Sequence, residues 1–408
     1  MASAAASATS PAYGAGGLAG VLPSVLRSLG VAEGPQAGSD LATVHPLPSA
    51  GGAGLLELPP ARRAVVALID GLGYDLLRQR GGHAPFLRGL LPAAYRLSAG
   101  FPSTTATSMG TFGTGLPPGA HGLVGYEVLV PGEDQLLNEL SWTTNGKHHG
   151  PDPRRWQPRE TVFERAEAAG VAVTRIGPGF FDGSGLTRAA LRGGTFRAAH
   201  DLTARVLASV DALRAASRSL VYLYWGDLDK VGHVFGCRSW EWGDELEVID
   251  AALAQLVDKV PADTAVYVTG DHGMVDAPHA LRIDLAYDPV LSAGVRHVGG
   301  EPRALQLYCE PGAAADVLAT WRERVGRRAW VHSREEVVRA GWFGQVTERV
   351  LPRIGDVVVA MRENFAIVDS RRARPELLAL IGLHGSLTSD EEGVPLVVVP
   401  PRGRSRTV

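Results

Sequence analysis

The feature that most constrains the fold of this sequence is a series of short apolar runs, each ending in small or acidic residues. Such runs are typical of buried parallel strands, because both faces of these strands are covered. Between them, apolar residues recur at intervals of three and four, which indicates helices, for example at 198–217 and 241–260. Alternating strands and helices predict an α/β fold with a doubly wound, mostly parallel sheet. The clearest runs are 64–70, 171–177, 220–225, 265–271, 356–360 and 395–399.

A less regular segment, 275–373, is expected to form a small cap inserted before the last core elements. It contains an apolar run at 303–308 and helical patterns at 313–325 and 335–340. A chain of 408 residues is long enough for one large α/β domain that carries such an insertion.

The ends of the chain differ in composition from the expected domain at 21–400. Residues 1–20 are rich in Ala, Ser and Gly and are expected to form a flexible tail. Residues 401–408 carry three arginines and are expected to form a second, solvated tail. The beginning of the sequence lacks the basic start and apolar core of a signal peptide, and no run approaches the length of a membrane span.

Charge and cysteine content narrow the function classes. A formal net charge of -3 gives no basic field for polymeric nucleic acid or an anionic membrane. Two cysteines, Cys237 and Cys309, are too few for a disulfide scaffold and fit a reducing compartment. We therefore expect a cytoplasmic protein whose partner is a small molecule.

Aspartates and histidines stand at expected strand ends and loops, where ligands of doubly wound proteins gather. A D-x-x-G-H motif joins Asp229 to His233, and Asp227 is a second carboxylate beside it. Carboxylate and imidazole suit zinc or manganese. Each motif alone has a structural alternative, since Asp-Gly after a strand is often a turn. The candidate ligands are Asp70, Asp229, His233, Asp271, His272 and His384.

A hydroxyl-rich segment follows Phe101-Pro102 and opens an expected helix. Ser and Thr at this place either cap the helix or provide a nucleophile beside an anion-binding helix start. The cap is the simpler interpretation of this segment alone, because a hydroxyl nucleophile needs activation by a base or a metal. The hydroxyl residues are Ser103, Thr104, Thr105, Thr107 and Ser108.

The order of these motifs resembles the alkaline phosphatase superfamily, most closely its type I phosphodiesterase/nucleotide pyrophosphatase family. In that family an Asp after the first strand precedes a Phe-Pro-x-x-Thr segment, here 101–105, and a Gly-Leu-x-Pro-x-x-His-Gly run, here 115–122. D-x-x-G-H, Asp-His-Gly and a late His-Gly complete the set. The resemblance covers roughly 64–400, and the Ala-, Gly- and Arg-rich character is similar to a bacterial branch that includes cyclic di-AMP phosphodiesterases.

This resemblance implies two divalent metal ions, for which mixed Asp and His ligands admit zinc, manganese or iron. It also implies that Thr105, rather than the next best hydroxyl Thr104, attacks phosphorus in line, and that water hydrolyses the phosphothreonine intermediate. One ion would be held by Asp70, Thr105, Asp271 and His272. The other would be held by Asp229, His233 and His384.

One departure from the family pattern concerns the phosphate contact. The family places an Asn shortly after the His-Gly run, and this chain has Tyr126 there. Asn138 could substitute, although a polar loop residue is an equally good interpretation of it. His121 is expected to be structural, and Glu301 has no role that the sequence supports.

The leading hypothesis is a monomeric phosphoric diester hydrolase that cleaves a nucleotide phosphodiester or pyrophosphate bond. A cyclic or linear di-adenosine dinucleotide, c-di-AMP or pApA, is the best single substrate. The first alternative keeps the metals in a phosphomonoesterase, phosphonate hydrolase or phosphosugar mutase. A sulfatase lacks support because no Cys/Ser-x-Pro-x-Arg segment is present. The other alternative, a nucleotide-binding pseudoenzyme, conflicts with the complete ligand set.

Overall fold

The computed structural model describes residues 10–32, 54–148 and 150–403. Its centre is a seven-stranded sheet in the order β2-β19-β10-β1-β9-β7-β8. β19 runs antiparallel to its neighbours, and the other strands are mutually parallel. This confirms the mostly parallel α/β sheet that the apolar runs predict. The strands are β1 (Arg63–Ile69), β2 (Tyr95–Ser98), β7 (Ala172–Gly177), β8 (Thr195–Ala198), β9 (Ser219–Trp225), β10 (Thr264–Thr269) and β19 (Gly393–Val399).

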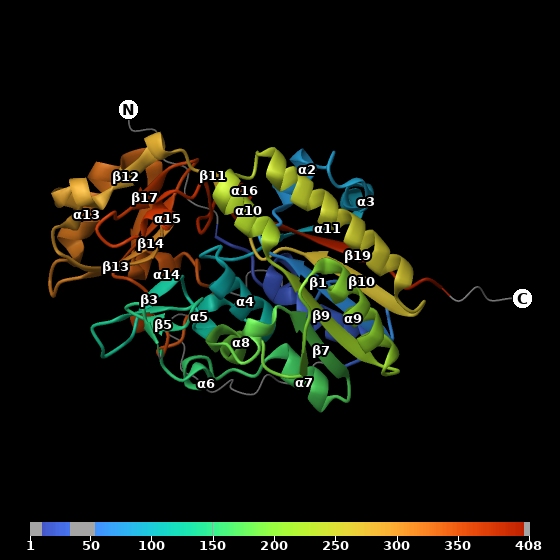
Figure 1. The fold of residues 1–408 in the computed structure, drawn as a ribbon. Helices are drawn as coiled ribbons and strands as arrows, with labels where there is room; N and C mark the ends of the chain where they lie inside the picture. The colour runs from blue at the N-terminus through green and yellow to red at the C-terminus, as the bar shows by residue number, and fades with distance from the viewer. Residues whose placement is uncertain (1–9, 33–53, 149, 404–408) are drawn as a thin grey trace, which may run out of the picture.

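Helices cover both faces of this sheet, and β1 shows why its sequence is apolar throughout. Val65 and Ala67 pack with the helices of one face, whereas Val66 and Leu68 pack with those of the other. Alternate side chains of a strand point to opposite faces, so a strand covered on both sides needs an unbroken apolar run. The first face carries α2 (Tyr74–Gln79), α3 (Pro85–Leu90), α9 (Leu202–Arg214) and α11 (Trp240–Lys259) (Figure 1). The second carries α1 (Val21–Ser28), α4 (Thr105–Thr114), α7 (Val162–Ala168) and α8 (Gly185–Ala190).

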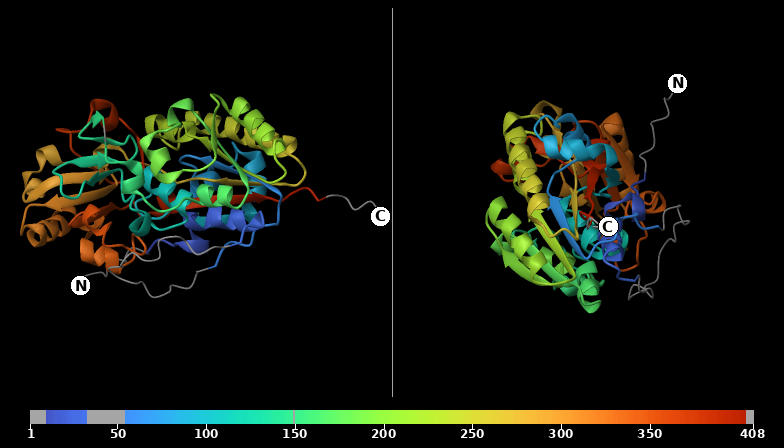
Figure 2. Two further views of the ribbon diagram at one scale, coloured as in Figure 1. Left: turned by 90° about the horizontal axis from the view of Figure 1, so that it is seen from below. Right: turned by 90° about the vertical axis from the view of Figure 1, so that its right-hand side faces the viewer.

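The segment predicted as a cap forms a second, antiparallel sheet in the order β13-β14-β16-β15, with its own apolar cluster under α13. Figures 1 and 2 show this sheet at one end of the molecule, with the central sheet at the other. The apolar run at 356–360 belongs here rather than to the parallel sheet. The strands of this second sheet and the helices beside them are β13 (Val295–Glu301), β14 (Ala304–Cys309), α13 (Ala314–Val325), β15 (Ala329–Ser333), α14 (Arg334–Arg339) and β16 (Val357–Met361). Beside it, β12 (Arg282–Asp284) pairs with β17 (Ala366–Val368).

The prediction of a flexible tail over 1–20 is wrong for residues 10–20; residues 1–9 lie outside the described part of the chain. Leu18 is fully buried, and the Tyr13 hydroxyl donates to the Trp342 carbonyl at 2.5 Å. Small residues let this segment approach the core closely, so its Ala- and Gly-rich composition does not indicate disorder. At the other end, Arg402 donates to the Val260 carbonyl at 2.6 Å, and residues 404–408 lie outside the described part.

In the described parts of the chain, no helix has both the length and the apolar character needed to cross a bilayer.

A small antiparallel sheet follows the His-Gly run, and the buried carboxyl group of Glu139 hydrogen-bonds the residues around it. Glu139, fully buried, accepts hydrogen bonds from the Val124 N–H at 2.9 Å and the Trp156 indole N–H at 2.7 Å. These bonds hold the loop that presents Tyr126. Burial raises the pKa of Glu139 to about 7, although its N–H donors oppose the rise. The strands are β3 (Glu127–Leu129), β4 (Leu136–Asn138), β5 (Thr143–Thr144) and β6 (Lys147–His148).

This raised pKa predicts a pH-dependent contribution to stability. The folded protein binds the Glu139 proton more tightly than the unfolded chain does. The stabilisation is therefore complete below the ordinary pKa of 4.5 and is lost as the pH rises through about 7. It amounts to about 3 kcal/mol. We expect Glu139→Gln to lower stability at every pH but to lose this dependence. Urea unfolding of both proteins at pH 5 and pH 8 measures it, and identical pH dependence in the two would contradict the assignment.

Candidate active site

Three neighbouring strands of the central sheet deliver three aspartates to one place. Asp70 follows β1, Asp271 follows β10, and Asp229 lies in the first turn of α10 (Asp227–Phe235), directly after β9. Because β10, β1 and β9 are adjacent and parallel, their carboxyl ends meet at one edge of the sheet. A sharp turn at Gly71, with φ of 74°, directs the chain away from this edge after Asp70.

Three histidines join these carboxylates from different elements. His272 follows Asp271 in the chain, and His233 lies one helical turn after Asp229 on α10. His384 comes from the loop after β18 (Gly382–Leu383), which pairs with β11 (Val275–Asp276). The imidazole rings of His272 and His384 stack with their centroids 3.6 Å apart.

The three imidazoles are oriented in the same way. Each has its Nδ1 within hydrogen-bond distance of a backbone carbonyl: His233 at 2.7 Å from Gly382, His272 at 2.9 Å from Gly273, and His384 at 3.0 Å from Ser103. A carbonyl only accepts, so each Nδ1 carries a proton, and in the neutral ring Nε2 is the nitrogen whose lone pair can bind a cation. Histidines that bind metals are commonly fixed in this manner.

The Nε2 atoms face the carboxylates. The Nε2 of His272 lies 3.3 Å from Asp70 Oδ1 and 3.6 Å from Asp271 Oδ2. The Nε2 of His233 lies 3.4 Å from Asp229 Oδ2, and that of His384 lies 3.9 Å from Asp229 Oδ1.

Among the described residues, two sets of side chains bring their ligand atoms within 4.8 Å of one another. One is Asp70, Asp271 and His272, and the other is Asp229, His272 and His384. His233 contacts Asp229 but lies outside both sets. Buried oxygens of Asp229 and Asp271 have no hydrogen-bond partner in the described chain. A buried carboxylate oxygen without a partner is costly, so these atoms fit a cation.

The electrostatics of the carboxylates also favour bound positive charge. Burial, followed by the charge of Asp70, raises the pKa of Asp271 to about 8. Burial also raises the pKa of Asp229. It would raise the pKa of Asp70 too, but contacts with His272 and Tyr224 outweigh it and lower that pKa. Three carboxylates that converge on one buried site cannot all ionise without a compensating cation.

Thr105, and not Thr104, is the hydroxyl that reaches this cluster. As the first residue of α4, it has its Oγ1 3.2 Å from His272 Nε2 and 3.5 Å from Asp70 Oδ1. Thr104 is 2 % exposed and stands before α4 as its N-cap residue, but its side chain forms no cap hydrogen bond. Thr107 and Ser108 lie further along α4, and both are buried.

The remaining predicted residues lie around the cluster. Asp227 is half exposed and pairs with Lys230 at 2.6 Å, so it does not compete with Asp229. Asn138 is the last residue of β4, and its side-chain oxygen accepts from the Leu140 and Ser141 N–H groups in the turn that follows. Tyr126 contacts Asn138 and is partly buried. His121 is buried, with its Nε2 3.1 Å from the Thr111 hydroxyl.

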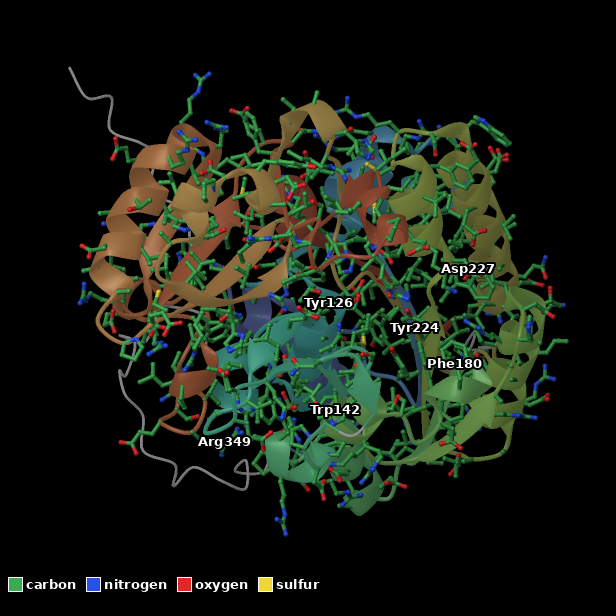
Figure 3. The ribbon with its side chains drawn as sticks, turned by 60° about the vertical axis from the view of Figure 1, so that its left-hand side comes forward. Tyr126, Trp142, Phe180, Tyr224, Asp227 and Arg349 are labelled. Atoms are coloured by element: carbon green, nitrogen blue, oxygen red, sulfur yellow. The ribbon has the colours of Figure 1, made fainter. Side chains whose placement is uncertain are left out.

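Sequence reasoning missed the residue that orients Asp70. The Tyr224 hydroxyl, from β9, donates to Asp70 Oδ2 at 2.5 Å. On its other side the Tyr224 ring contacts Phe181, and Phe181 contacts Phe180, which is 74 % exposed. Figure 3 shows Tyr224 toward the interior and Phe180 farther out. A Tyr five residues before Asp229 on an apolar strand gave no sign of this contact.

Sequence reasoning also missed a buried ion pair that anchors the His384 loop. Arg303 and Glu391, both fully buried, form two parallel hydrogen bonds of 2.8 and 2.6 Å. The same carboxylate accepts from the Ser386 N–H at 3.0 Å, two residues after His384. Arg303 lies in the turn between β13 and β14, so the second sheet holds part of the site in place.

The architecture matches known structures. Murine ectonucleotide pyrophosphatase/phosphodiesterase 5, as an inactive threonine-to-alanine variant in complex with AMP, is 18% identical, with a TM-score of 0.63 over 83% of this chain and 88% of that one. Phosphonoacetate hydrolase from Sinorhizobium meliloti 1021, in complex with phosphonoacetate, is 20% identical, with a TM-score of 0.63 over 86% of this chain and 94% of that one. At such identities the likeness shows the fold alone.

The sequence itself matches the family model described as type I phosphodiesterase / nucleotide pyrophosphatase over residues 64–387. This span begins with β1 and ends just after His384, so it contains every strand end and loop that builds the cluster. Members of this family depend on divalent metals. The protein is a phosphodiester hydrolase of the type I phosphodiesterase/nucleotide pyrophosphatase family.

Proposed function

We propose that this protein hydrolyses a phosphodiester or pyrophosphate bond of a nucleotide at a site that holds two divalent cations. The observation that carries the proposal is the common orientation of the three imidazoles. Their Nδ1 atoms are bound to backbone carbonyls, and their Nε2 atoms face buried carboxylates around one hydroxyl.

The donor set suits zinc, manganese or iron, all of which accept mixed nitrogen and oxygen ligands. When bound, two such cations lower the pKa of a hydroxyl and neutralise charge on the phosphoryl group and the leaving oxygen. Asp70, Asp271 and His272, with Thr105, would hold one of them. Asp229, His233 and His384 would hold the other.

Thr105 is the nucleophile in this proposal. Its oxygen forms a bond to phosphorus as the bond to the leaving oxygen breaks, and water then hydrolyses the phosphothreonine ester. The first N–H groups of α4 have no partners within the helix, and the N-cap side chain supplies none. They are free to donate to phosphoryl oxygens beside Thr105. The murine relative is inactive as a threonine-to-alanine variant, which supports a threonine nucleophile, and that variant binds AMP, which supports a nucleotide ligand.

A cyclic or linear di-adenosine dinucleotide, c-di-AMP or pApA, is our choice of substrate. Phe180 supports a base-bearing ligand, because an exposed aromatic ring next to Phe181 and Tyr224 offers a face on which a base can stack. The likeness to phosphonoacetate hydrolase favours a phosphonate as the second candidate. Product analysis by mass spectrometry over c-di-AMP, pApA, dinucleoside polyphosphates and phosphonoacetate distinguishes them. Turnover of phosphonoacetate alone would contradict the nucleotide assignment.

The nucleophile can be tested by two substitutions at one position. Thr105→Ala removes the attacking oxygen and should lower kcat on bis(p-nitrophenyl) phosphate by at least about 1,000-fold. Thr105→Ser keeps an oxygen at the same place and should retain measurable turnover. Metal analysis of both proteins is the control, since most of the metal should stay bound. Full activity of Thr105→Ala would assign the reaction to another hydroxyl.

The metal ligands can be tested with a matched pair on α10. Asp229→Asn removes a buried charge that faces His233 and His384, so metal content and activity should both fall, the affinity by about 10-fold or more. Asp227→Asn removes a half-exposed charge two residues away and should leave metal content unchanged. Elemental analysis after dialysis gives the result. Equal metal content in the two variants would remove Asp229 from the ligand set.

A further inference from the structure

The nucleophile segment, residues 101–105, is tied on one side to the His384 loop. The Ser103 N–H donates to the Gly385 carbonyl at 3.0 Å, and the Ser103 carbonyl lies 3.0 Å from His384 Nδ1. Thr105 comes two residues later, at the start of α4. The place of its hydroxyl therefore depends on how the backbone just before it is held.

On the other side, the nucleophile segment contacts a tyrosine from the beginning of the chain. The Tyr13 hydroxyl accepts from the Phe101 N–H at 3.3 Å and donates to the Trp342 carbonyl at 2.5 Å. Among the described residues, this hydroxyl is the partner of the Phe101 N–H. One hydroxyl group thus joins three segments that are far apart in the sequence.

The packing around Tyr13 brings it directly against this backbone. The buried ring of Phe101 lies against those of Trp342 and Phe343, with centroids 5.0 and 5.4 Å away. Gly100, just before the segment, has a φ of 97°, and a Cβ there would lie 3.0 Å from Tyr13 Cε1. Glycine suits this position because it combines such a backbone conformation with close approach of the tyrosine ring.

Tyr13 is itself held in place by the residues that follow it. Gly17 pairs with Ser98 at the end of β2, and Leu18 is fully buried. The match to the family model begins at residue 64, so it does not include Tyr13. The contact with the nucleophile segment therefore comes from a part of the chain that carries none of the family's motifs.

We propose that Tyr13 is a positioning residue, whose hydroxyl fixes the backbone of the nucleophile segment and so sets the position from which Thr105 attacks phosphorus. The proposal rests on the proposed function, in which Thr105 is the nucleophile. Without the hydroxyl, the Phe101 N–H and the Trp342 carbonyl lose their common partner, and the segment can shift relative to the metal ligands. A displacement of about 1 Å in a reacting group can cost about 100-fold in rate, so a smaller shift has a measurable effect.

The test compares two tyrosines whose hydroxyls form the same pair of bonds. The Tyr308 hydroxyl accepts from the Leu129 N–H at 3.0 Å and donates to the Arg353 carbonyl at 2.7 Å, and neither partner belongs to the nucleophile segment. Tyr13→Phe and Tyr308→Phe each remove one such bridge, so both should lower the melting temperature. Only Tyr13→Phe should slow the release of p-nitrophenol from bis(p-nitrophenyl) phosphate in single turnovers, by about 10-fold.

Two further measurements separate a shifted nucleophile from a damaged binding site. In Tyr13→Phe the inhibition constant of inorganic phosphate should stay within about 2-fold of the wild-type value. Metal content should be equal in the two proteins. Both expectations follow because the Tyr13 hydroxyl bonds to Phe101 and Trp342 and not to a proposed metal ligand.

Each outcome decides between explanations. Equal slowing in Tyr13→Phe and Tyr308→Phe would mean that the loss of any such bridge weakens the site, and it would overturn the proposal. An unchanged single-turnover rate in Tyr13→Phe would overturn it as well, and so would loss of metal from that variant. Failure of the wild-type protein to hydrolyse any phosphodiester would instead overturn the proposed function, and the positioning role with it.

Discussion

The repulsion among three buried carboxylates determines how the rest of the site is built. Asp70, Asp229 and Asp271 converge because β1, β9 and β10 are adjacent, and the fold gives them no alternative position. Each isolated buried charge would be strongly destabilising. Part of this cost is offset by the imidazoles, whose Nδ1 atoms are bound to backbone carbonyls, and by the Tyr224 hydroxyl, which donates to Asp70. These partners orient the oxygens, but they supply too little positive charge, and divalent cations complete the balance.

The second sheet takes part in this arrangement through one short turn. Glu301 and Arg303 stand on either side of Pro302, between β13 and β14. Glu301 Oε2 lies 3.7 Å from His384 Nδ1, while Arg303 forms the buried ion pair with Glu391 that anchors the His384 loop. Removing one partner of such a pair costs about 3–5 kcal/mol, because the other charge remains buried. The inserted segment thus contacts the His384 loop directly and helps to hold it in place.

Much of this could be predicted from the sequence. Unbroken apolar runs identify strands buried on both faces, and parallel neighbours place their ends together, so Asp70, Asp229 and Asp271 follow from strand order. Thr105 was one of several hydroxyls, and only the fold shows that it is the one that faces His272. Asp227 and Asp229 were nearly equivalent in sequence. Residues two positions apart on a helix point in different directions. In the structure Asp229 faces His233, whereas Asp227 pairs with Lys230.

What could not be predicted depends on contacts between segments far apart in the chain. Tyr224 lies 154 residues from Asp70, and Arg303 lies 88 from Glu391, and no local pattern marks either pair. The start of α4 is harder still, because Thr104 does not form the side-chain cap hydrogen bond that its position predicts. A threonine before a helix predicts a cap, and here that prediction fails beside the proposed nucleophile. Local preference is set aside where the helix start is needed for something else, which is why such failures are a useful indication of function.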